Sequence, residues 1–280
     1  MSAAGFFDIT RPANAVMAGV AAVVAYFIAT GTLIPAAFLL LIVVTLITAA
    51  GNVINDYCDA DIDLVNRADR PIPSGQVSRK NALLFAILLF AGGIIVSLGT
   101  NVICLAIAVF NSFLLALYAA RLKSLPLIGN IAVSYLSGSM FLFGGALAGM
   151  AGLIHLVPIA VMTFLAMMAR ELLKDAEDVE GDKAGGAVTL PIRIGVKKTA
   201  SLAFVFVLLS CLASGVPFLW WGIPYLVLIG IVDVTLIVAA VKALSCNTPA
   251  CVRHSGASAV LKYGMFASLL VFVASALFFG

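Results

Sequence analysis

The chain has 280 residues, of which 63% are hydrophobic and 10% are charged, and its formal net charge at pH 7 is +3. A soluble domain is about half apolar and roughly a quarter charged, and it hides only part of its surface. This composition excludes soluble enzymes, nucleic-acid-binding modules and disordered scaffolds. We therefore expect an all-α polytopic membrane protein that forms a single domain over residues 1–280.

Nine apolar segments are long enough to cross a bilayer as helices. They cover residues 13–30, 34–55, 81–99, 102–120, 127–148, 153–174, 199–215, 218–240 and 259–279. All 16 lysines and arginines fall on the same side of this pattern. Because cationic loops stay in the cytoplasm, we expect a protein of the cell membrane whose N-terminus and basic loops are cytoplasmic and whose C-terminus is outside.

Most of the 13 acidic residues lie in two clusters, directly after the second and the sixth span. Asn55-x3-Asp59-x3-Asp63 matches Lys174-x3-Asp178-x3-Asp182, and each motif is followed by Pro-Ile-x2-Gly and a basic pair. The halves 13–120 and 127–240 are therefore predicted to be repeats of one orientation, with the ninth helix added. We expect a bundle of nine helices around a central cavity, with the two motifs facing each other.

Helical spacing groups the acidic side chains of each cluster on one face, within an arc of about 100° or less. Stacked like charges destabilise a helix, so neighbouring basic residues or divalent cations must compensate them. A solvated acidic loop explains neither the one-faced spacing nor its repetition. Oxygen ligands without Cys or His suit Mg²⁺ or Ca²⁺ and disfavour zinc, and no twelve-residue calcium-loop pattern is present. The pattern favours Mg²⁺.

Basic residues stand around both acidic clusters, which is typical of a site for a phosphate or diphosphate held through metal. At the mouth of an apolar cavity, the ligand indicated is a lipid diphosphate whose departure is stabilised by metal and bases. Aromatic side chains facing a dry chamber would then stabilise an allylic carbocation. The aromatic candidates for this chamber are Tyr118, Tyr135, Phe141 and Phe143.

The first motif, Asn55-Asp56-Tyr57-Cys58-Asp59-Ala60-Asp61-Ile62-Asp63, resembles the NDxxDxxxD signature of the UbiA superfamily of intramembrane prenyltransferases. Asp175-x2-Asp178-x3-Asp182 resembles the second aspartate motif of that family, and the likeness extends over the whole chain. Further stretches, at residues 10–14, 69–75 and 170–182, look most similar to archaeal members that make ether lipids. The resemblance implies transfer of a geranylgeranyl group from its diphosphate to the hydroxyl of geranylgeranylglyceryl phosphate.

The resemblance also implies roles for individual residues. Asn55, Asp59 and Asp63 would bind one Mg²⁺ and Asp178 and Asp182 the other, with Asp56 and Asp175 in or beside these shells. The four motif residues expected to carry catalysis are Asp59, Asp63, Asp178 and Asp182. The candidates for diphosphate contact are Asn52, Arg67, Arg70, Tyr118, Arg121, Lys123 and Lys174. Arg11 and Asn14 are the candidates for the acceptor, and no general base is identified.

Three other functions are compatible with part of the pattern. A prenyltransferase acting on an aromatic quinone precursor or on haem would use the same donor motifs. A CDP-alcohol phosphotransferase would need a glycine where Ala60 follows Asp59. A cation transporter is favoured only by Asp233, inside the eighth span, which could equally bond to a neighbouring helix.

Two smaller predictions concern packing. Gly145-x3-Gly149 is expected to be a small-residue helix contact. All five cysteines are expected to be free thiols packed as small apolar side chains. Chain-length preference and oligomeric state stay open.

Overall fold

The computed structural model describes residues 2–279, apart from the side chains of Val65 and Asn66. Within this range the secondary structure is helical and contains no strand, which confirms the all-α prediction. The helices are α1 (Ala3–Ile9), α2 (Pro12–Thr30), α3 (Ala37–Asn66), α4 (Arg79–Ser97), α5 (Val102–Ala120), η1 (Leu122–Ser124), α6 (Ile128–Leu147), α7 (Met150–Glu177), α8 (Val179–Ala184), α9 (Leu190–Ile194), α10 (Val196–Ala213), α11 (Phe218–Leu244), α12 (Pro249–Ser255) and α13 (Ala257–Phe278).

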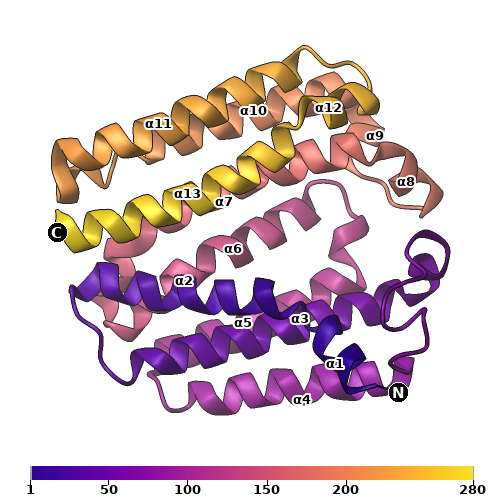
Figure 1. Cartoon of the computed structure of the whole chain (residues 1–280), viewed down its shortest axis with the longest axis horizontal. Helices are drawn as coiled ribbons and strands as arrows, with labels where there is room; N and C mark the ends of the chain where they lie inside the picture. Colours follow the sequence, from indigo (N-terminus) through magenta and orange to yellow (C-terminus); the bar gives the residue numbers. More distant parts are fainter. Residues whose placement is uncertain (1, 280) are drawn as a thin grey trace. The chain divides into compact units, whose positions relative to one another are not determined.

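Nine helical segments of the described chain are long and apolar enough to cross a membrane, as predicted. They correspond to α2, α3, α4, α5, α6, α7, α10, α11 and the α12–α13 segment (Figure 1). Two of them run further than their apolar stretches. α3 continues to Asn66, through the first aspartate motif, and α7 continues to Glu177, into the second. The first motif is therefore carried on the polar end of a membrane-spanning helix, and the second begins on such an end at Asp175.

The chain divides into two compact units, and the first contains Met1–Leu122 and Ser139–His155. Within it, α3 packs against α2, α4 and α5 (Figure 1). The core includes the fully buried Leu40 and Val43 of α3 and Phe143 of α6. The predicted repeat of residues 13–120 and 127–240, and the central cavity, stay predictions.

Gly144 allows α6 to approach α2 closely in this unit. A Cβ atom at Gly144 would lie 2.3 Å from the Ala22 carbonyl oxygen and 2.8 Å from the Tyr26 backbone nitrogen. Backbone atoms cannot move aside as the end of a side chain can, so the two helices would have to separate. Such close approach is how small residues promote helix association in membranes.

We expect Gly144→Ala to destabilise the protein by about 1–3 kcal/mol, the usual cost of overpacking. Gly92→Ala is the matched control, because a Cβ there would lie 3.8 Å from Leu46, at ordinary contact distance. The measurement is thermal unfolding in detergent. Gly144→Ala should lower the midpoint by several degrees and Gly92→Ala should not. Equal midpoints for the two variants would contradict this account of the α2–α6 contact.

The predicted contact of Gly145 and Gly149 is half right. A Cβ at Gly145 would lie 2.6 Å from the Gly152 carbonyl oxygen, so this glycine does sit against the start of α7. Gly149 has a φ of +90° and nothing within 4 Å of its Cβ position. It lies between α6 and α7 and permits the turn, because a left-handed backbone favours glycine. The prediction is therefore wrong for Gly149.

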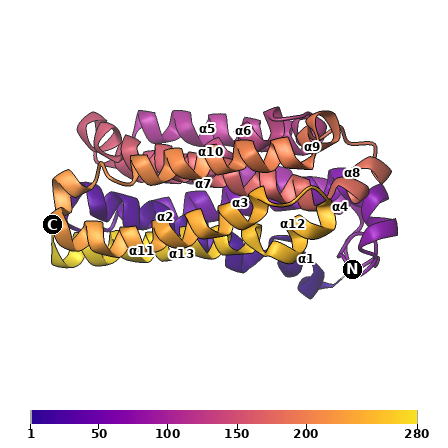
Figure 2. The ribbon, with the colours of Figure 1, turned by 90° about the horizontal axis from the view of Figure 1, so that it is seen from above.

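The second unit contains Lys123–Gly138 and Leu156–Gly280. Its core joins buried residues of α7, α10, α11, α12 and α13, among them Leu172, Leu173 and Leu261. α11 packs against α10 and α13. The short helices α8, α9 and α12 lie at the same end of this unit, and the C-terminus lies at the opposite end (Figures 1 and 2).

Asp233 of α11 is bonded to a neighbouring helix end. The Ser214 hydroxyl, just after α10, donates to Oδ2 of Asp233 at 2.6 Å, and the Tyr225 hydroxyl donates to the Ser214 carbonyl at 2.7 Å. Polar contacts of this kind join helices within a membrane. The contact gives Asp233 a structural role, which was one of its two predicted interpretations.

The prediction of five free thiols is wrong for two of them. Cys246 and Cys251 form a disulfide with a Cα–Cα distance of 5.4 Å. Cys58, Cys104 and Cys211 form no disulfide within the described residues, as predicted. The helix α11 ends at Leu244 and α12 begins at Pro249, so the chain turns between the two cysteines and brings their Cα atoms into bonding range. Sequence spacing alone does not reveal such a turn.

Candidate functional site

The first aspartate motif lies on the last turns of α3, where its members fall on one side of the helix. The amide of Asn55 donates to Oδ2 of Asp59 at 3.0 Å, and both side chains are half-buried. This is the i, i+4 contact that helical spacing predicts. The pair presents one amide oxygen and one carboxylate together.

Asp56 and Asp63 are held by arginines. Arg70 donates through Nη1 to Oδ2 of Asp63 at 2.7 Å and to Oδ1 of Asp56 at 3.1 Å. Arg11 forms a second ion pair with Oδ1 of Asp56. Asp56 is 4% exposed and Asp63 is 5% exposed, so these charges would be costly without partners. The structure thus compensates part of the first acidic cluster with basic side chains.

Arg11 has an unusual backbone conformation. Its φ of 49° and ψ of 63° are left-handed, and it is followed by Pro12, which favours an extended residue before it. The ion pair with Asp56 helps to hold it, the Arg11 amide donates to the Asp8 carbonyl at 3.0 Å, and the Asn52 amide donates to the adjacent Thr10 carbonyl at 2.8 Å. Non-glycine residues keep such strained backbones only where their surroundings fix them.

The remaining charges near α3 are on the surface. Arg79 pairs with Asp61 at 3.0 Å and lies over the ring of Tyr57, 5.2 Å from its centroid. Arg67, a candidate for diphosphate contact, is exposed just after α3, and Asn14, a candidate for acceptor contact, is exposed on the first turn of α2. The first unit therefore brings Arg11 and Arg70 to the motif, while Arg79 belongs to an outer pair.

The second aspartate motif spans a break between two helices. Asp175 lies on the last turn of α7, Asp178 separates α7 from α8, and Asp182 lies on α8. The Asn130 amide, from α6, donates to Oδ2 of Asp175 at 2.9 Å. Asn130 is buried and was not among the predicted site residues, although an asparagine inside an apolar segment is a signal that could have identified it.

Asp182 carries a buried oxygen that has no hydrogen-bond partner within the described part of the chain, its Oδ2 atom. Burial raises the pKa of the Asp182 carboxyl, the nearby Thr189 side chain opposes this as a hydrogen-bond donor, the negative charge of Asp178 adds to it, and Lys174 opposes it. Asp178 and Lys174 are themselves exposed. A buried carboxylate oxygen without a partner calls for an external cation or donor.

The motifs fit Mg²⁺ by the chemistry of their donors. Each offers carboxylate oxygens, the first adds an amide oxygen, and Mg²⁺ needs few protein ligands because it keeps several waters and substrate phosphate oxygens. Over residues 2–279, however, no three Asp, Glu, His or Cys side chains converge closely enough to form a ligand set by themselves. The ion pair of Arg70 with Asp63 explains part of this lack of convergence, because the Asp63 carboxylate is oriented toward the arginine.

The other predicted site residues lie at the end of α5, in η1 and within α6. Tyr118 is half-buried on the last turn of α5, Arg121 is exposed directly after it, and Lys123 lies in η1. Phe143 is buried in the core of the first unit, where it packs against apolar side chains. Its predicted role beside a carbocation stays a prediction. Phe141 is buried and Tyr135 half-buried, and their predicted roles stay predictions.

Nine apolar helices within residues 2–279, with carboxylates and basic residues at the polar ends of α3 in the first unit and α7 in the second, define an integral membrane protein. The model of the UbiA prenyltransferase family matches residues 18–270 of the chain. The chain belongs to this family and is a prenyl-transferring enzyme.

Individual relatives cover nearly the whole chain. The digeranylgeranylglyceryl phosphate synthase of Methanoregula boonei is 59% identical over 278 residues, which cover 99% of this chain and 100% of the relative. A solved structure of a digeranylgeranylglyceryl phosphate synthase has a TM-score of 0.85 at 35% identity and covers 98% of both chains. A UbiA homolog from Archaeoglobus fulgidus, bound to GPP and Mg²⁺, shares the fold, with a TM-score of 0.66 at 16% identity over 96% of this chain and 99% of its own.

Proposed function

We propose that the chain transfers a geranylgeranyl group from geranylgeranyl diphosphate to the free hydroxyl of geranylgeranylglyceryl phosphate, with Mg²⁺ as cofactor. The products are digeranylgeranylglyceryl phosphate and diphosphate, and the reaction makes an ether bond of archaeal membrane lipids. The observation that carries this proposal is the 59% identity, over the full length, to a relative named for this product. Both aspartate motifs that the donor chemistry requires are present on helix ends.

The first motif has the clearest set of roles in this reaction. Asn55, Asp59 and Asp63 hold one Mg²⁺, and Arg70 adds positive charge beside Asp63. Bound Mg²⁺ stabilises the charge that develops on the leaving diphosphate. Asp56 keeps Arg11 and Arg70 in place, since both pair with its Oδ1 atom.

The second motif holds the other Mg²⁺ through Asp178 and Asp182, with Asp175 beside it. The buried, unpartnered Oδ2 atom of Asp182 supports this assignment among the described residues, because a divalent cation would satisfy it. Asn130 fixes the Asp175 carboxylate through its hydrogen bond. The proposed contacts of the diphosphate are Asn52, Arg67, Arg70, Tyr118, Arg121, Lys123 and Lys174, and the Asn52 amide also donates to the Thr10 carbonyl at 2.8 Å.

In the transfer step, the bond between C1 of the prenyl chain and the diphosphate oxygen breaks, and an ether bond forms between C1 and the acceptor oxygen. The acceptor hydroxyl loses its proton to a carboxylate or to the released diphosphate. The chain binds both lipids from the membrane. We place its N-terminus and both motifs on the cytoplasmic side and its C-terminus outside, because all 16 basic residues gather on that side of the predicted topology.

The function is tested by a turnover assay on purified protein in detergent. Geranylgeranyl diphosphate is offered with geranylgeranylglyceryl phosphate or with 4-hydroxybenzoate, with Mg²⁺ or with EDTA. Metal-dependent diphosphate release with the glyceryl phosphate alone is the expected result. Release with the aromatic acceptor alone would agree with a prenyltransferase but show that the proposed acceptor is wrong. No release with either acceptor would overturn the proposal.

Arg11 and Asn14 are proposed to bind the acceptor phosphate, and Arg11 gives the sharper test. We expect Arg11→Ala to raise the KM for geranylgeranylglyceryl phosphate about ten-fold, since one hydrogen bond to a charged group is worth roughly 1.5–3 kcal/mol. The KM for the diphosphate donor should change less. Arg79→Ala is the matched control, because Arg79 pairs with the exposed Asp61. Equal changes in both KM values would remove the acceptor assignment.

A further inference from the structure

Arg253, on α12, contacts the break in the second aspartate motif. Its Nη2 atom donates to the Glu177 carbonyl at 2.6 Å, across 76 residues of sequence. The same atom lies 4.0 Å from Oδ1 of Asp178. Glu177 is the last residue of α7 and Asp178 directly precedes α8, so Arg253 binds the point where the motif changes helix.

This contact matters because the motif depends on how α7 ends. The last carbonyls of a helix have no partner within it, and a cation at this end interacts favourably with the helix dipole. At the break, the Asp178 amide donates to the Lys174 carbonyl at 3.1 Å, and the Asp182 amide donates to the Asp178 carbonyl at 2.9 Å. Arg253 adds an external contact that fixes Glu177 and hence the direction in which Asp178 leaves α7.

The ion pair alone would contribute little. The Arg253 side chain is 61% exposed and that of Asp178 is 51% exposed, and exposed pairs have small net energies. The short bond to the Glu177 carbonyl is the part that defines geometry. Arg253 therefore influences mainly the backbone geometry of the motif, through Glu177, and contributes little by pairing with the charge of Asp178.

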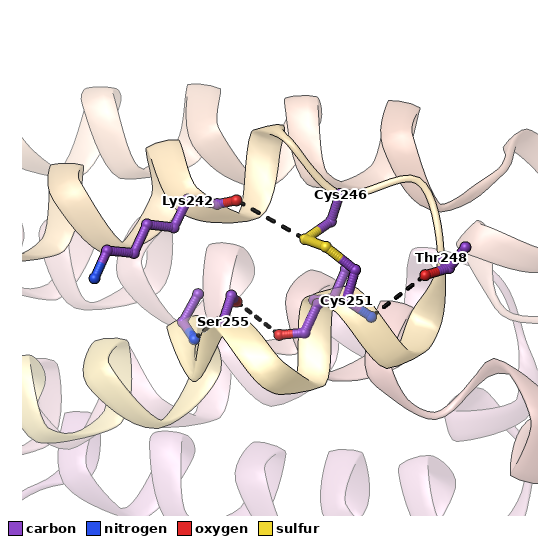
Figure 3. The surroundings of a disulfide bond; sticks show 7 residues. Lys242, Cys246, Thr248, Cys251 and Ser255 are labelled. Carbon is purple, nitrogen blue, oxygen red and sulfur yellow. Dashed lines mark hydrogen bonds between the residues drawn. A yellow bond between two sulfur atoms is a disulfide. The ribbon is translucent and has the colours of Figure 1, made fainter.

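The helix that carries Arg253 is itself fixed by a disulfide. α12 has seven residues, too few to be stable alone. Val252, which directly precedes Arg253 on α12, is fully buried in the core of the second unit. At the start of α12, the Cys251 amide donates to the Thr248 hydroxyl at 3.3 Å, and the Cys246–Cys251 bond joins the helix to the end of α11 (Figure 3). Closing this short loop restricts the positions open to α12.

We propose that Arg253 is a positioning residue for the second aspartate motif, and that the Cys246–Cys251 disulfide holds it there by fixing α12. The inference rests on the proposed binding of Mg²⁺ by that motif. A dithiol reductant would transfer two electrons and two protons to the disulfide, leave two thiols and become a disulfide itself. The reduced protein then loses the covalent link between α11 and α12, and the contact of Arg253 with Glu177 loosens.

The test measures Mg²⁺ binding without turnover. Bound Mg²⁺ should raise the thermal unfolding temperature of the protein, and the half-effective Mg²⁺ concentration is the one that produces half of this rise. Arg253→Ala should raise this concentration about ten-fold, the lower end for partners that orient metal ligands. Arg253→Lys, which keeps the charge but loses the planar fork, should recover only part of it. Lys198→Ala is the matched control, since Lys198 is an exposed cation elsewhere in the same unit.

The disulfide is tested by treating the protein with dithiothreitol and by the double change Cys246→Ser with Cys251→Ser. Each should raise the half-effective Mg²⁺ concentration in the same direction, and neither should raise it further in an Arg253→Ala background. The same shift should appear in the Mg²⁺ dependence of diphosphate release, with kcat at saturating Mg²⁺ nearly unchanged. Hydrogen exchange of the backbone amides at residues 178–184 should become faster in the Arg253→Ala variant, in the reduced protein and in the double serine variant.

The outcomes separate this inference from the proposed function. If the unaltered protein neither binds Mg²⁺ nor releases diphosphate, the proposed function fails and the inference fails with it. If it does both, and Arg253→Ala leaves the half-effective Mg²⁺ concentration and the exchange at residues 178–184 unchanged, the role of Arg253 is overturned alone. An Arg253→Ala effect that neither reduction nor the double serine change reproduces would overturn the role of the disulfide.

Discussion

Asp59→Asn should reduce diphosphate release by roughly a thousand-fold and leave a folded, extractable protein. The amide keeps the size of the carboxylate and still accepts a hydrogen bond, so the Asn55 contact at 3.0 Å can persist. It removes the negative charge that we propose for binding Mg²⁺. The measurement is the turnover assay at several Mg²⁺ concentrations, together with thermal unfolding of the variant.

Asp178→Asn should have an effect of the same size, because Asp178 is proposed to bind the other Mg²⁺. The chain offers a matched control for each change. Asp61→Asn alters an exposed carboxylate on the same helix as Asp59, and Glu180→Gln alters an exposed one on α8, two residues from Asp178. Both controls should keep near-normal turnover. Normal activity in Asp59→Asn or in Asp178→Asn would remove the two-metal site.

Much of the fold could be predicted from the sequence because the membrane leaves few choices. A segment in lipid must satisfy its own backbone, so a long apolar stretch becomes a helix, and the nine predicted stretches correspond to nine helices of residues 2–279 that are long and apolar enough to span a membrane. Helix ends were harder. The predicted second span ends at residue 55, whereas α3 runs to Asn66. The polar motif stays helical there because Asn55, Arg70 and Arg11 compensate its carboxylates.

Turns and close approaches could not be predicted at the level of single residues. Gly145 and Gly149 have the same spacing as a helix contact, but only Gly145 lies at one, since α6 ends before Gly149. The disulfide of Cys246 and Cys251 likewise depends on a turn that the sequence does not specify. Both errors have one cause, which is that periodicity describes a helix and gives no account of the loop that follows it.

The candidate site was predictable in its residues and less so in their partners. The motif spacing predicted the carboxylates, and the clustering of basic residues predicted Arg70 beside them, whereas Arg11 was expected at the acceptor and not at Asp56. Which carboxylate each arginine meets depends on where the chain returns after α1 and after α3, and this requires the structure. Asn130 was missed for the same reason, since its role comes from the contact of α6 with Asp175 on α7.

Asp56→Asn should lower kcat/KM by about a hundred-fold, because Asp56 holds two arginines at once. Asp56 is buried, and in this variant two cations lose the anion that they share, so neither arginine is held in its place. Arg11 would also lose the ion pair that helps to hold its left-handed backbone, with φ of 49°. Hydrogen exchange at residues 3–12 should therefore become faster.

The same variant distinguishes an anchor for arginines from a ligand for metal. If Asp56 acts through Arg11 and Arg70, Asp56→Asn should raise the KM for both lipid substrates, while the Mg²⁺ concentration for half-maximal activity changes little. Asp63→Asn should shift the Mg²⁺ dependence, because Asp63 is a proposed ligand that also meets Arg70. A rise in the Mg²⁺ requirement of Asp56→Asn as large as that of Asp63→Asn would place Asp56 among the ligands.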